Sequence, residues 1–338
     1  MSQPANSPQH AIQAARHQIR AYLGADQVKA LHRPLPALDA LAVISTLLLA
    51  TANSAWLATL PPVLWLAAGA LLQGWLIQLA GLVSHDLFVH RRVGGERWSQ
   101  FGALLLTLPR LSLPVGYETA HLCHHRHLGS EQDSEQYKQA LTSRRRRLLF
   151  STLLGVRLVQ ARKLDQGRHY HDVSGASAAN RARAVRERWL LRLWLLLMIV
   201  LTVIWPAQMA WAYWIPLLVV APVINSIRLV LEHADADVRS GDAWQLGTWY
   251  RTGPVSRLLF LWDSGDCHLV HHIFPRMPFY HVGACVDALT PLIERHNPRP
   301  HRSLAKLLYG WYVLALPHRQ PWPGPAGAGR PAASGETV

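Results

Sequence analysis

Two long stretches of the chain contain no charged side chain, and they constrain the fold more than any other feature. Residues 40–84 form a run of 45 residues without Asp, Glu, Lys or Arg, and residues 193–227 form a second run of 35. A membrane-spanning helix needs about 20 apolar residues, so each run can hold two helices joined by a tight turn. Soluble helices are seldom uncharged on every face, which argues against two buried hairpins in a large soluble core.

The sequence also indicates where each run turns. Pro61 and Pro62 interrupt the first run, because proline ends helices. The Trp-rich segment from Trp205 to Trp214 in the second run is typical of a membrane interface. We therefore predict an all-α membrane protein with four transmembrane helices in two hairpins and a cytoplasmic helical cap that carries a dimetal site. The predicted spans are about residues 38–58, 62–84, 189–206 and 211–231.

The charged residues indicate the orientation in the membrane. The chain has 34 Lys and Arg against 20 Asp and Glu, a net charge of +14, and its basic segments lie outside the two runs, at the N-terminus, Ser143–Arg147 and Arg181–Arg188. The positive-inside rule places these segments and both termini in the cytoplasm. No zinc-finger, helix-turn-helix or aromatic RNA-binding pattern accompanies them, so we expect anionic lipid contacts and no nucleic-acid partner.

Histidines gather where the uncharged runs end. The spacing HxxHH occurs twice, and it places three imidazoles on one face of a helix. Imidazole binds Zn, Cu, Fe and Ni, and nine such ligands exceed the four that satisfy one structural zinc, so we predict two metal ions. The candidate ligands are His85 and His90 in HDLFVH, His121, His124 and His125 in HLCHH, His233 in LEH, and His268, His271 and His272 in HLVHH.

The spacing of the first pair leaves its role open. His85 and His90 are five residues apart, about 140° around an ideal α-helix. We expect them either to straddle a helix end or to serve different ions. Carboxylates often hold the outer N–H of a metal-bound histidine, and otherwise they are solvated acids. The candidates for this supporting role are Asp86, Glu118, Asp263 and Asp266, whereas Glu232 can form a helix-face ion pair with Arg228.

Three other classes of protein fit the sequence less well. A metal or proton transporter needs ionisable groups at mid-membrane depth, but the two runs contain none and the histidines lie to one side of them. A bis-His haem protein would place paired histidines on facing spans inside the bilayer, and the same absence argues against it. A hydrolase is not indicated, because HExxH and GxSxG motifs are missing.

The histidine motifs resemble the three histidine boxes of the integral-membrane fatty acid desaturase and hydroxylase superfamily. The resemblance covers roughly residues 35–300 and extends to HHIFPRMPFY after the third box and SEQDSE after the second. It implies a non-haem di-iron centre, bound by the nine histidines named above, that uses O2 as co-substrate to attack a C–H bond of a fatty acyl or other lipid chain. By the same resemblance Asn225 is a neighbour of the metals, and no catalytic residue beyond the metal ligands is expected.

The resemblance leaves the reaction open. We favour fatty acid desaturation, while hydroxylation, ketolation, acetylenic bond formation and decarboxylation to a terminal alkene remain alternatives, because all begin with the same hydrogen abstraction. No HPGG haem motif occurs, so we expect electrons from a separate ferredoxin or rubredoxin with its reductase. The expected location is a bacterial inner membrane.

The chain divides accordingly into three segments. Residues 1–34 form a cytoplasmic N-terminal segment, residues 35–300 the desaturase-like membrane domain, and residues 301–338 a cytoplasmic tail. The end of this tail is rich in Pro, Gly and Ala, a composition typical of disorder.

The orientation can be tested with reporter fusions. We expect reporters placed after Pro61 and after Gln208 to lie outside the cytoplasm, because both turns carry no charge and the basic segments hold the opposite side. Paired alkaline phosphatase and green fluorescent protein fusions measure this, and a fluorescent fusion at either site would contradict the topology.

Overall fold

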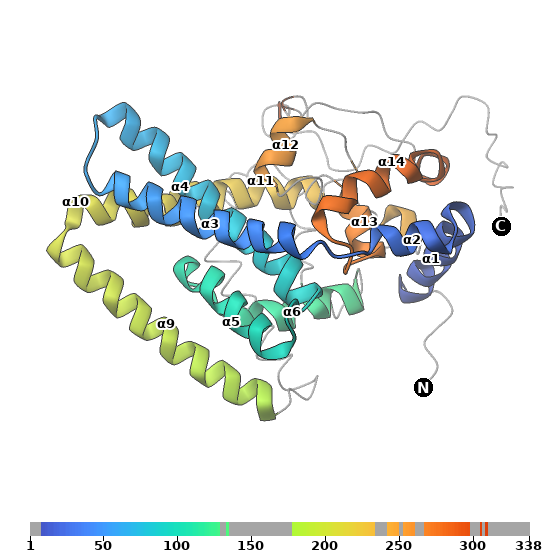
Figure 1. Cartoon of the computed structure of the whole chain (residues 1–338), viewed down its shortest axis with the longest axis horizontal. Helices are drawn as coiled ribbons and strands as arrows, with labels where there is room; N and C mark the ends of the chain where they lie inside the picture. Colours follow the sequence, from blue (N-terminus) through green and yellow to red (C-terminus); the bar gives the residue numbers. More distant parts are fainter. Residues whose placement is uncertain are drawn as a thin grey trace, which may run out of the picture.

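The computed structural model describes residues 8–128, 133–134, 178–233, 242–249, 253–260, 267–297, 305 and 308–309. This part of the chain is helical and contains no strand (Figure 1). The elements run in the order α1 (Pro8–Leu23), α2 (Ala25–Leu31), α3 (Pro36–Leu57), α4 (Val63–Ser84), η1 (His85–His90), α5 (Glu96–Thr107), η2 (Leu108–Arg110), α6 (Pro114–His127), α9 (Ala178–Ile204), α10 (Pro206–Met209), η4 (Ala210–Trp214), η5 (Pro216–Val220), α11 (Ala221–His233), η6 (Ala243–Gln245), α12 (Pro254–Leu259), α13 (His268–Ile273) and α14 (Phe279–His296).

The first uncharged run forms the hairpin of α3 and α4. Gly69 lets the two helices approach closely, because a Cβ at this position would lie 2.6 Å from the Trp56 ring and 2.7 Å from Leu57. The buried Asn53 amide donates to the carbonyl oxygen of Gly69 at 2.9 Å and to Oε1 of Gln73 at 3.0 Å. Small residues and interhelical hydrogen bonds of this kind hold helices together where the surroundings offer no water.

The second uncharged run also forms a hairpin. Helix α9 ends at Ile204, the chain reverses at Trp205, and α10, η4, η5 and α11 continue back toward the rest of the molecule. The η4 and η5 segments are π-helical, and Pro216, at the start of η5, has no N–H to donate to the helical ladder. A Cβ at Gly74 would lie 2.4 Å from the Val220 side chain, so this side chain of η5 packs directly against the backbone of α4.

Within the described residues, three helices are long and apolar enough to cross a membrane. They lie within Ala25–Leu57, Val63–His90 and Pro206–Leu229. Helix α9, which covers the predicted span at about residues 189–206, is not among them, because its last 18 residues carry Glu187, Arg188 and Arg192. Three candidate spans are therefore established, and the fourth stays a prediction.

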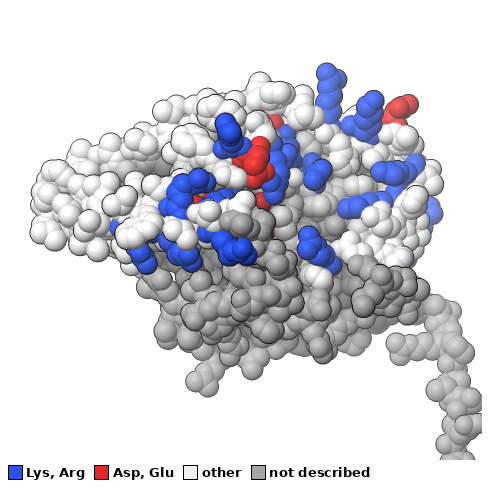
Figure 2. Space-filling model, turned by 90° about the horizontal axis from the view of Figure 1, so that it is seen from below, with Lys and Arg blue, Asp and Glu red and all other residues white. Residues whose placement is uncertain are grey.

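A hydrophobic core of buried side chains lies at the end of the molecule opposite the two hairpin turns. Helices α1, α2, α13 and α14 and the η6 turn pack around it (Figure 1). Figure 2 shows that Lys and Arg spread over this face from the middle of the molecule to this end, while the opposite end, formed by the hairpin turns, is white. Exposed leucine, valine and tryptophan side chains cover α3, α4 and α9 near these turns, as expected for surfaces that contact lipid.

The close contact at Gly74 can be tested by substitution. We expect Gly74→Val to lower the free energy of unfolding by about 1–3 kcal/mol, because the added side chain overlaps Val220. Ala68→Val, at an exposed position of the same helix, is the matched control. Thermal unfolding in detergent measures both, and equal midpoints for the two variants would show that α4 and η5 do not pack this closely.

Candidate metal centre

The π-helical turn η1 brings the first two histidines together. His85 and His90 stand at its two ends, and their Nε2 atoms are 3.1 Å apart. A π-helix forms its backbone hydrogen bonds between residues five apart, so such residues lie on the same side of the helix. On an α-helix the same spacing would separate the two side chains by about 140°. The pair lies just past the end of α4, within one π-helical turn, and the 140° separation expected for an α-helix does not apply there.

Helix α6 supplies the next group. Nε2 of His121 lies 2.8 Å from Nε2 of His85 and 2.9 Å from Nε2 of His90. His125, one turn further along the same face, places its Nε2 atom 3.0 Å from that of His121. Tyr117, one turn earlier, stacks its ring on His121 with centroids 5.5 Å apart and planes at 12°.

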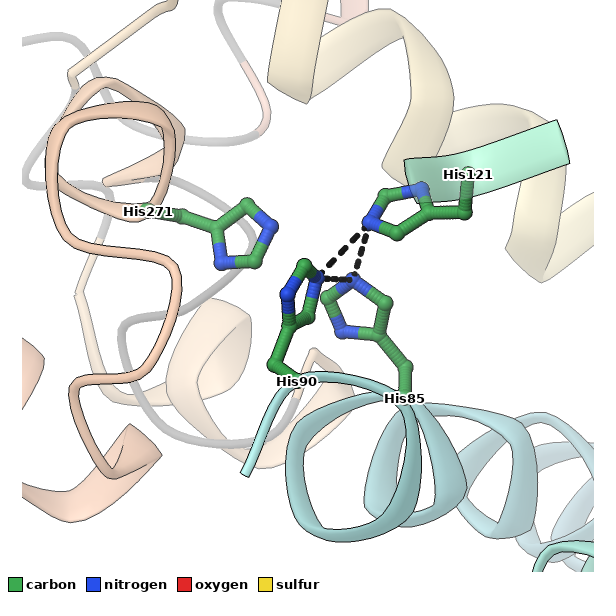
Figure 3. Close-up of side chains that lie close together, drawn as sticks. All are labelled: His85, His90, His121 and His271. Atoms are coloured by element: carbon green, nitrogen blue, oxygen red, sulfur yellow. Dashed lines mark hydrogen bonds between the residues drawn. The ribbon is translucent and has the colours of Figure 1, made fainter. Parts of the chain in front are cut away.

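Helix α13 closes the cluster from a third direction. Figure 3 shows His271 facing His85, His90 and His121, and the possible ligand atoms of these four side chains all lie within 4.8 Å of one another. Nε2 of His271 is also 3.1 Å from Nε2 of His125. Five imidazoles from three separate helices thus converge on one small volume.

The geometry of this cluster fits a metal ion. Nε2 atoms of His85, His90 and His121 form a triangle with sides of 2.8, 2.9 and 3.1 Å. Each neutral imidazole has a single N–H, which lies in the plane of its ring. Hydrogen bonds are strongest when they are close to linear, so three nitrogens that point at one centre cannot all be satisfied by one another. Nitrogen ligands about 2.0–2.1 Å from a shared ion stand roughly 3 Å apart, as these do.

A second group of histidines adjoins the first. The His272 ring has its centroid 4.4 Å from that of His268, 5.1 Å from that of His124 and 5.0 Å from that of His125. His124, His268 and His272 are each 2–3% exposed. His233 is the last residue of α11, and the position of its side chain lies outside the described part of the structure. These residues could hold a second ion beside the first, with His125 between the two groups.

Burial keeps the histidines in the form that binds metal. Desolvation lowers the pKa of His125 well below its usual value of 6.5, and the neighbouring imidazoles lower it further. The pKa of His271 is lowered well below 6.5 for the same reasons. Since only the neutral imidazole is a ligand, both side chains are ready for metal at neutral pH.

The carboxylate beside the second group is one that the sequence analysis did not select. Oδ1 of Asp133 accepts a hydrogen bond of 2.8 Å from Nδ1 of His124, and both residues are buried. This contact orients Nε2 of His124 away from Asp133 and makes the ring a stronger ligand. Asp133 belongs to the acidic SEQDSE segment. This segment supported the family resemblance, but nothing in the sequence indicated that Asp133 contacts His124. Glu232 pairs with Arg228 at 3.0 Å as expected and also lies 3.7 Å from Nδ1 of His268.

The carboxylates and the amide selected from the sequence have other partners. Asp86 pairs with Arg91 at 3.2 Å, and Arg91 also binds Asp39 with both of its terminal nitrogens. Asn225 accepts a hydrogen bond of 3.0 Å from the Gln78 amide. Asp263 and Asp266 lie outside the described residues.

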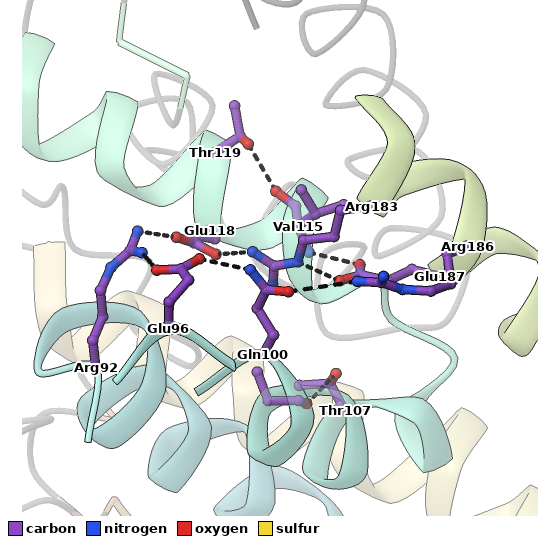
Figure 4. A network of polar contacts seen from close by, with 11 residues as sticks. Arg92, Glu96, Gln100, Thr107, Val115, Glu118, Thr119, Arg183, Arg186 and Glu187 are labelled. Atoms are coloured by element: carbon purple, nitrogen blue, oxygen red, sulfur yellow. Dashed lines mark hydrogen bonds and ion pairs between the residues drawn. The ribbon is translucent and has the colours of Figure 1, made fainter. Parts of the chain in front are cut away.

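Glu118 belongs to an ion-pair network that joins three helices (Figure 4). It binds Arg92 at 2.5 Å and Arg183 at 2.8 Å, and Arg183 in turn binds Glu187 at 2.7 Å. Glu187 also accepts the backbone N–H of Val115 at 2.9 Å, at the start of α6. Arg92 also pairs with Glu96 at the start of α5, so the network fixes α6 against α5 and α9. It lines a small pocket to which Tyr117 also contributes. Glu118 therefore supports the position of the α6 histidines rather than touching them.

Helix α1 fixes the ends of both histidine helices. The Gln9 amide donates to the carbonyl oxygen of His125 at 2.7 Å, and Nε of Arg16 donates to that of Ile273 at 2.7 Å. These carbonyls belong to the last turns of α6 and α13, which otherwise lack partners within their helices. The sequence gives only a weak signal for this role, namely a polar face on an N-terminal helix.

A short strap ties the third box to α11. The backbone N–H of Leu269 donates to the carbonyl oxygen of Thr248 at 3.0 Å, and the N–H of Thr248 donates to the backbone carbonyl oxygen of Glu232 at 3.2 Å. A Cβ on Gly247 would lie 2.7 Å from the nitrogen of Leu269, so only glycine permits this approach. The strap places the end of α11 beside α13.

The role of Asp133 can be tested through metal affinity. We expect Asp133→Ala to weaken metal binding 10–100-fold, because His124 loses its orienting partner. Asp26→Ala removes an exposed carboxylate and serves as the control. Anaerobic Fe(II) titration against a chelator measures both variants, and an unchanged affinity in Asp133→Ala would remove this residue from the site.

Comparison with known proteins agrees with the geometry. The chain matches the family described as Fatty acid desaturase over residues 54–303, which is 250 of its 338 residues. No curated protein matches the chain. The matched region contains all nine histidines and the three elements that carry the described cluster. The resemblance based on the histidine motifs is confirmed: the chain belongs to the fatty acid desaturase family, the superfamily of membrane desaturases and hydroxylases.

Proposed function

We propose that the protein is a membrane-bound, O2-dependent oxidoreductase that desaturates a fatty acyl chain with two iron ions. The observation that carries this proposal is the convergence of imidazole nitrogens from η1, α6 and α13, in a chain whose family contains desaturases and hydroxylases. Bound iron, with O2 and external electrons, would supply the oxidation of an unactivated C–H bond.

The composition of the ligand set supports iron over other ions. The described ligand atoms are imidazole nitrogens, and no carboxylate oxygen belongs to the cluster of His85, His90, His121 and His271. Such a set is unsuited to Mg or Ca, which prefer oxygen, but suits Fe and Zn. The family's oxidative chemistry favours iron, because zinc does not change its oxidation state.

The protein's own residues would position these ions and shield them from water. Asp133 orients His124, and α1 holds the histidine helices at their C-terminal ends. Most of the cluster is buried, with His90 5% and His271 8% exposed. The cluster lies where α4 leaves its apolar span, so a lipid chain within the membrane would reach it without crossing an aqueous phase.

External electrons require a partner. We propose a separate donor such as a ferredoxin or rubredoxin with its reductase, docking on the side of the molecule that carries the metal centre. The basic residues over this half (Figure 2) would attract an acidic donor as well as anionic lipid. The same distribution supports a cytoplasmic position for the metal centre and for both termini.

The proposal can be tested by profiling lipids in a host that expresses the protein. We expect new double bonds in the fatty acids of cells with the wild-type chain and none with His271→Ala, because this variant loses a nitrogen ligand. His17→Ala, an exposed histidine of α1, is the control and should behave as the wild type.

The products also separate the alternatives. Hydroxylated, ketonic, acetylenic or terminal-alkene products that depend on His271 would keep the metal site and replace desaturation with another reaction of the same family. If the wild type changes neither unsaturation, oxygenation nor alkene content, a fatty acyl substrate is excluded in that host.

A further inference from the structure

Arg110 carries a positive charge into the helix bundle beside the metal centre. It is the last residue of η2, and its Nη2 donates to Oε1 of the buried Gln78 on α4 at 3.0 Å. Its Nη1 lies 1.3 Å from the point that a Cβ on Gly81 would occupy. The guanidinium therefore packs against the backbone of α4, in a space that exists only because residue 81 is glycine.

The backbone around Arg110 is held in place. The Tyr213 hydroxyl donates to the carbonyl oxygen of Pro109 at 2.9 Å, and Nε1 of Trp194 donates to that hydroxyl at 3.0 Å. Leu111 follows with a φ of 53°, a left-handed conformation that is costly for a residue with a Cβ. The η2 turn is thus fixed against α9 and η4 in a strained conformation that directs Arg110 inward.

Among the described residues, no carboxylate balances the charge of Arg110. Within the described part of the chain, Gln78 is its hydrogen-bond partner and no carboxylate lies in ion-pair distance. Burial is the main cause that lowers the pKa of Arg110 to about 10, with Tyr117 opposing this shift and Arg228 adding to it, so the side chain stays protonated at neutral pH. Three other arginines differ from Arg110 because each has an acidic partner. Arg91 binds Asp39 and Asp86, Arg183 binds Glu118 and Glu187, and Arg228 binds Glu232.

Arg110 is also close to the metal ligands. Gly81 precedes His85 by four residues on one continuous helix, a rise of about 6 Å. Tyr117 interacts electrostatically with Arg110 and stacks on His121, so it connects the two sites. Because α4 runs from the hairpin turn toward His85, the guanidinium lies on the apolar side of the metal ligands.

We infer that Arg110 binds the carboxylate of a free fatty acid and so fixes the substrate relative to the metals, an inference that rests on the proposed function. A guanidinium accommodates a carboxylate with two parallel hydrogen bonds, and this pairing is strong where water is scarce. A thioester substrate has a neutral carbonyl at the corresponding position, which cannot form this charged pair with a guanidinium. The carbons oxidised would therefore be those nearest the carboxylate.

Binding to protein in phosphatidylcholine nanodiscs tests the inference without turnover. We expect Arg110→Gln to weaken palmitate binding roughly ten- to hundred-fold and to change hexadecanol binding by less than about twofold, because only the acid carries a charge. Arg110→Lys should fall between the wild type and Arg110→Gln for palmitate. Arg186→Gln, which removes an exposed cation of α9, is the control and should leave both ligands unaffected.

Several results would overturn the inference. Equal weakening of palmitate and hexadecanol by Arg110→Gln would make Arg110 a structural residue, and unchanged palmitate binding would place the carboxylate elsewhere. Palmitoyl-CoA binding as tightly as palmitate, with the same dependence on Arg110, would also contradict it. If Arg110→Gln unfolds, the ratio of palmitate to hexadecanol affinity in Arg110→Lys decides. Arg110-dependent palmitate binding without any oxidised product would contradict the proposed function alone.

Discussion

The rest of the structure depends on the convergence of imidazole nitrogens from three helices. Nε2 atoms of His85, His90 and His121 lie 2.8–3.1 Å apart although they come from two elements separated by α5 and η2. Such nitrogens have no mutual hydrogen-bonding arrangement that satisfies all of them, so the cluster calls for a cation. Helix α1, the Thr248 strap and the Glu118 network hold the three helices in position, and each of them is far from the others in sequence.

The parts of this account that could be predicted from sequence are local ones. The uncharged runs and the HxxHH spacing can be recognised from short stretches of sequence. For this reason α3, α4 and the histidine motifs were expected where the structure places them. The π-turn that joins His85 to His90 could not be predicted, because it depends on how α4 packs beyond its span. The contact between Asp133 and His124 requires knowledge of where the chain returns after α6. The partners of Asp86 and Glu118 also depend on folded geometry: Asp86 pairs with Arg91, which lies just past the π-turn, and Glu118 pairs with Arg183 of the distant α9.

Buried charge is treated in two different ways in this protein. Arg91 and Arg183 each bind two carboxylates, and these compensated groups fix helices to one another. Arg110 is held with similar rigidity, against Gly81 and through Gln78, but its charge is left for a ligand. Arg110 is partly buried and bonded to a neutral amide within the described residues, so its positive charge is available to an anionic ligand. The compensated arginines therefore serve stability, and Arg110 serves recognition.

The central claim is that the histidine cluster holds two iron ions, and metal analysis tests it most directly. Protein purified from aerobic cells supplied with iron should contain two irons per chain, measured by plasma mass spectrometry against quantitative amino-acid analysis. Replacement of His85, His121 or His271 by alanine should lower this content while the protein remains in the membrane. Stoichiometric zinc in the native protein, with no iron bound and no iron-dependent oxidation, would contradict the account.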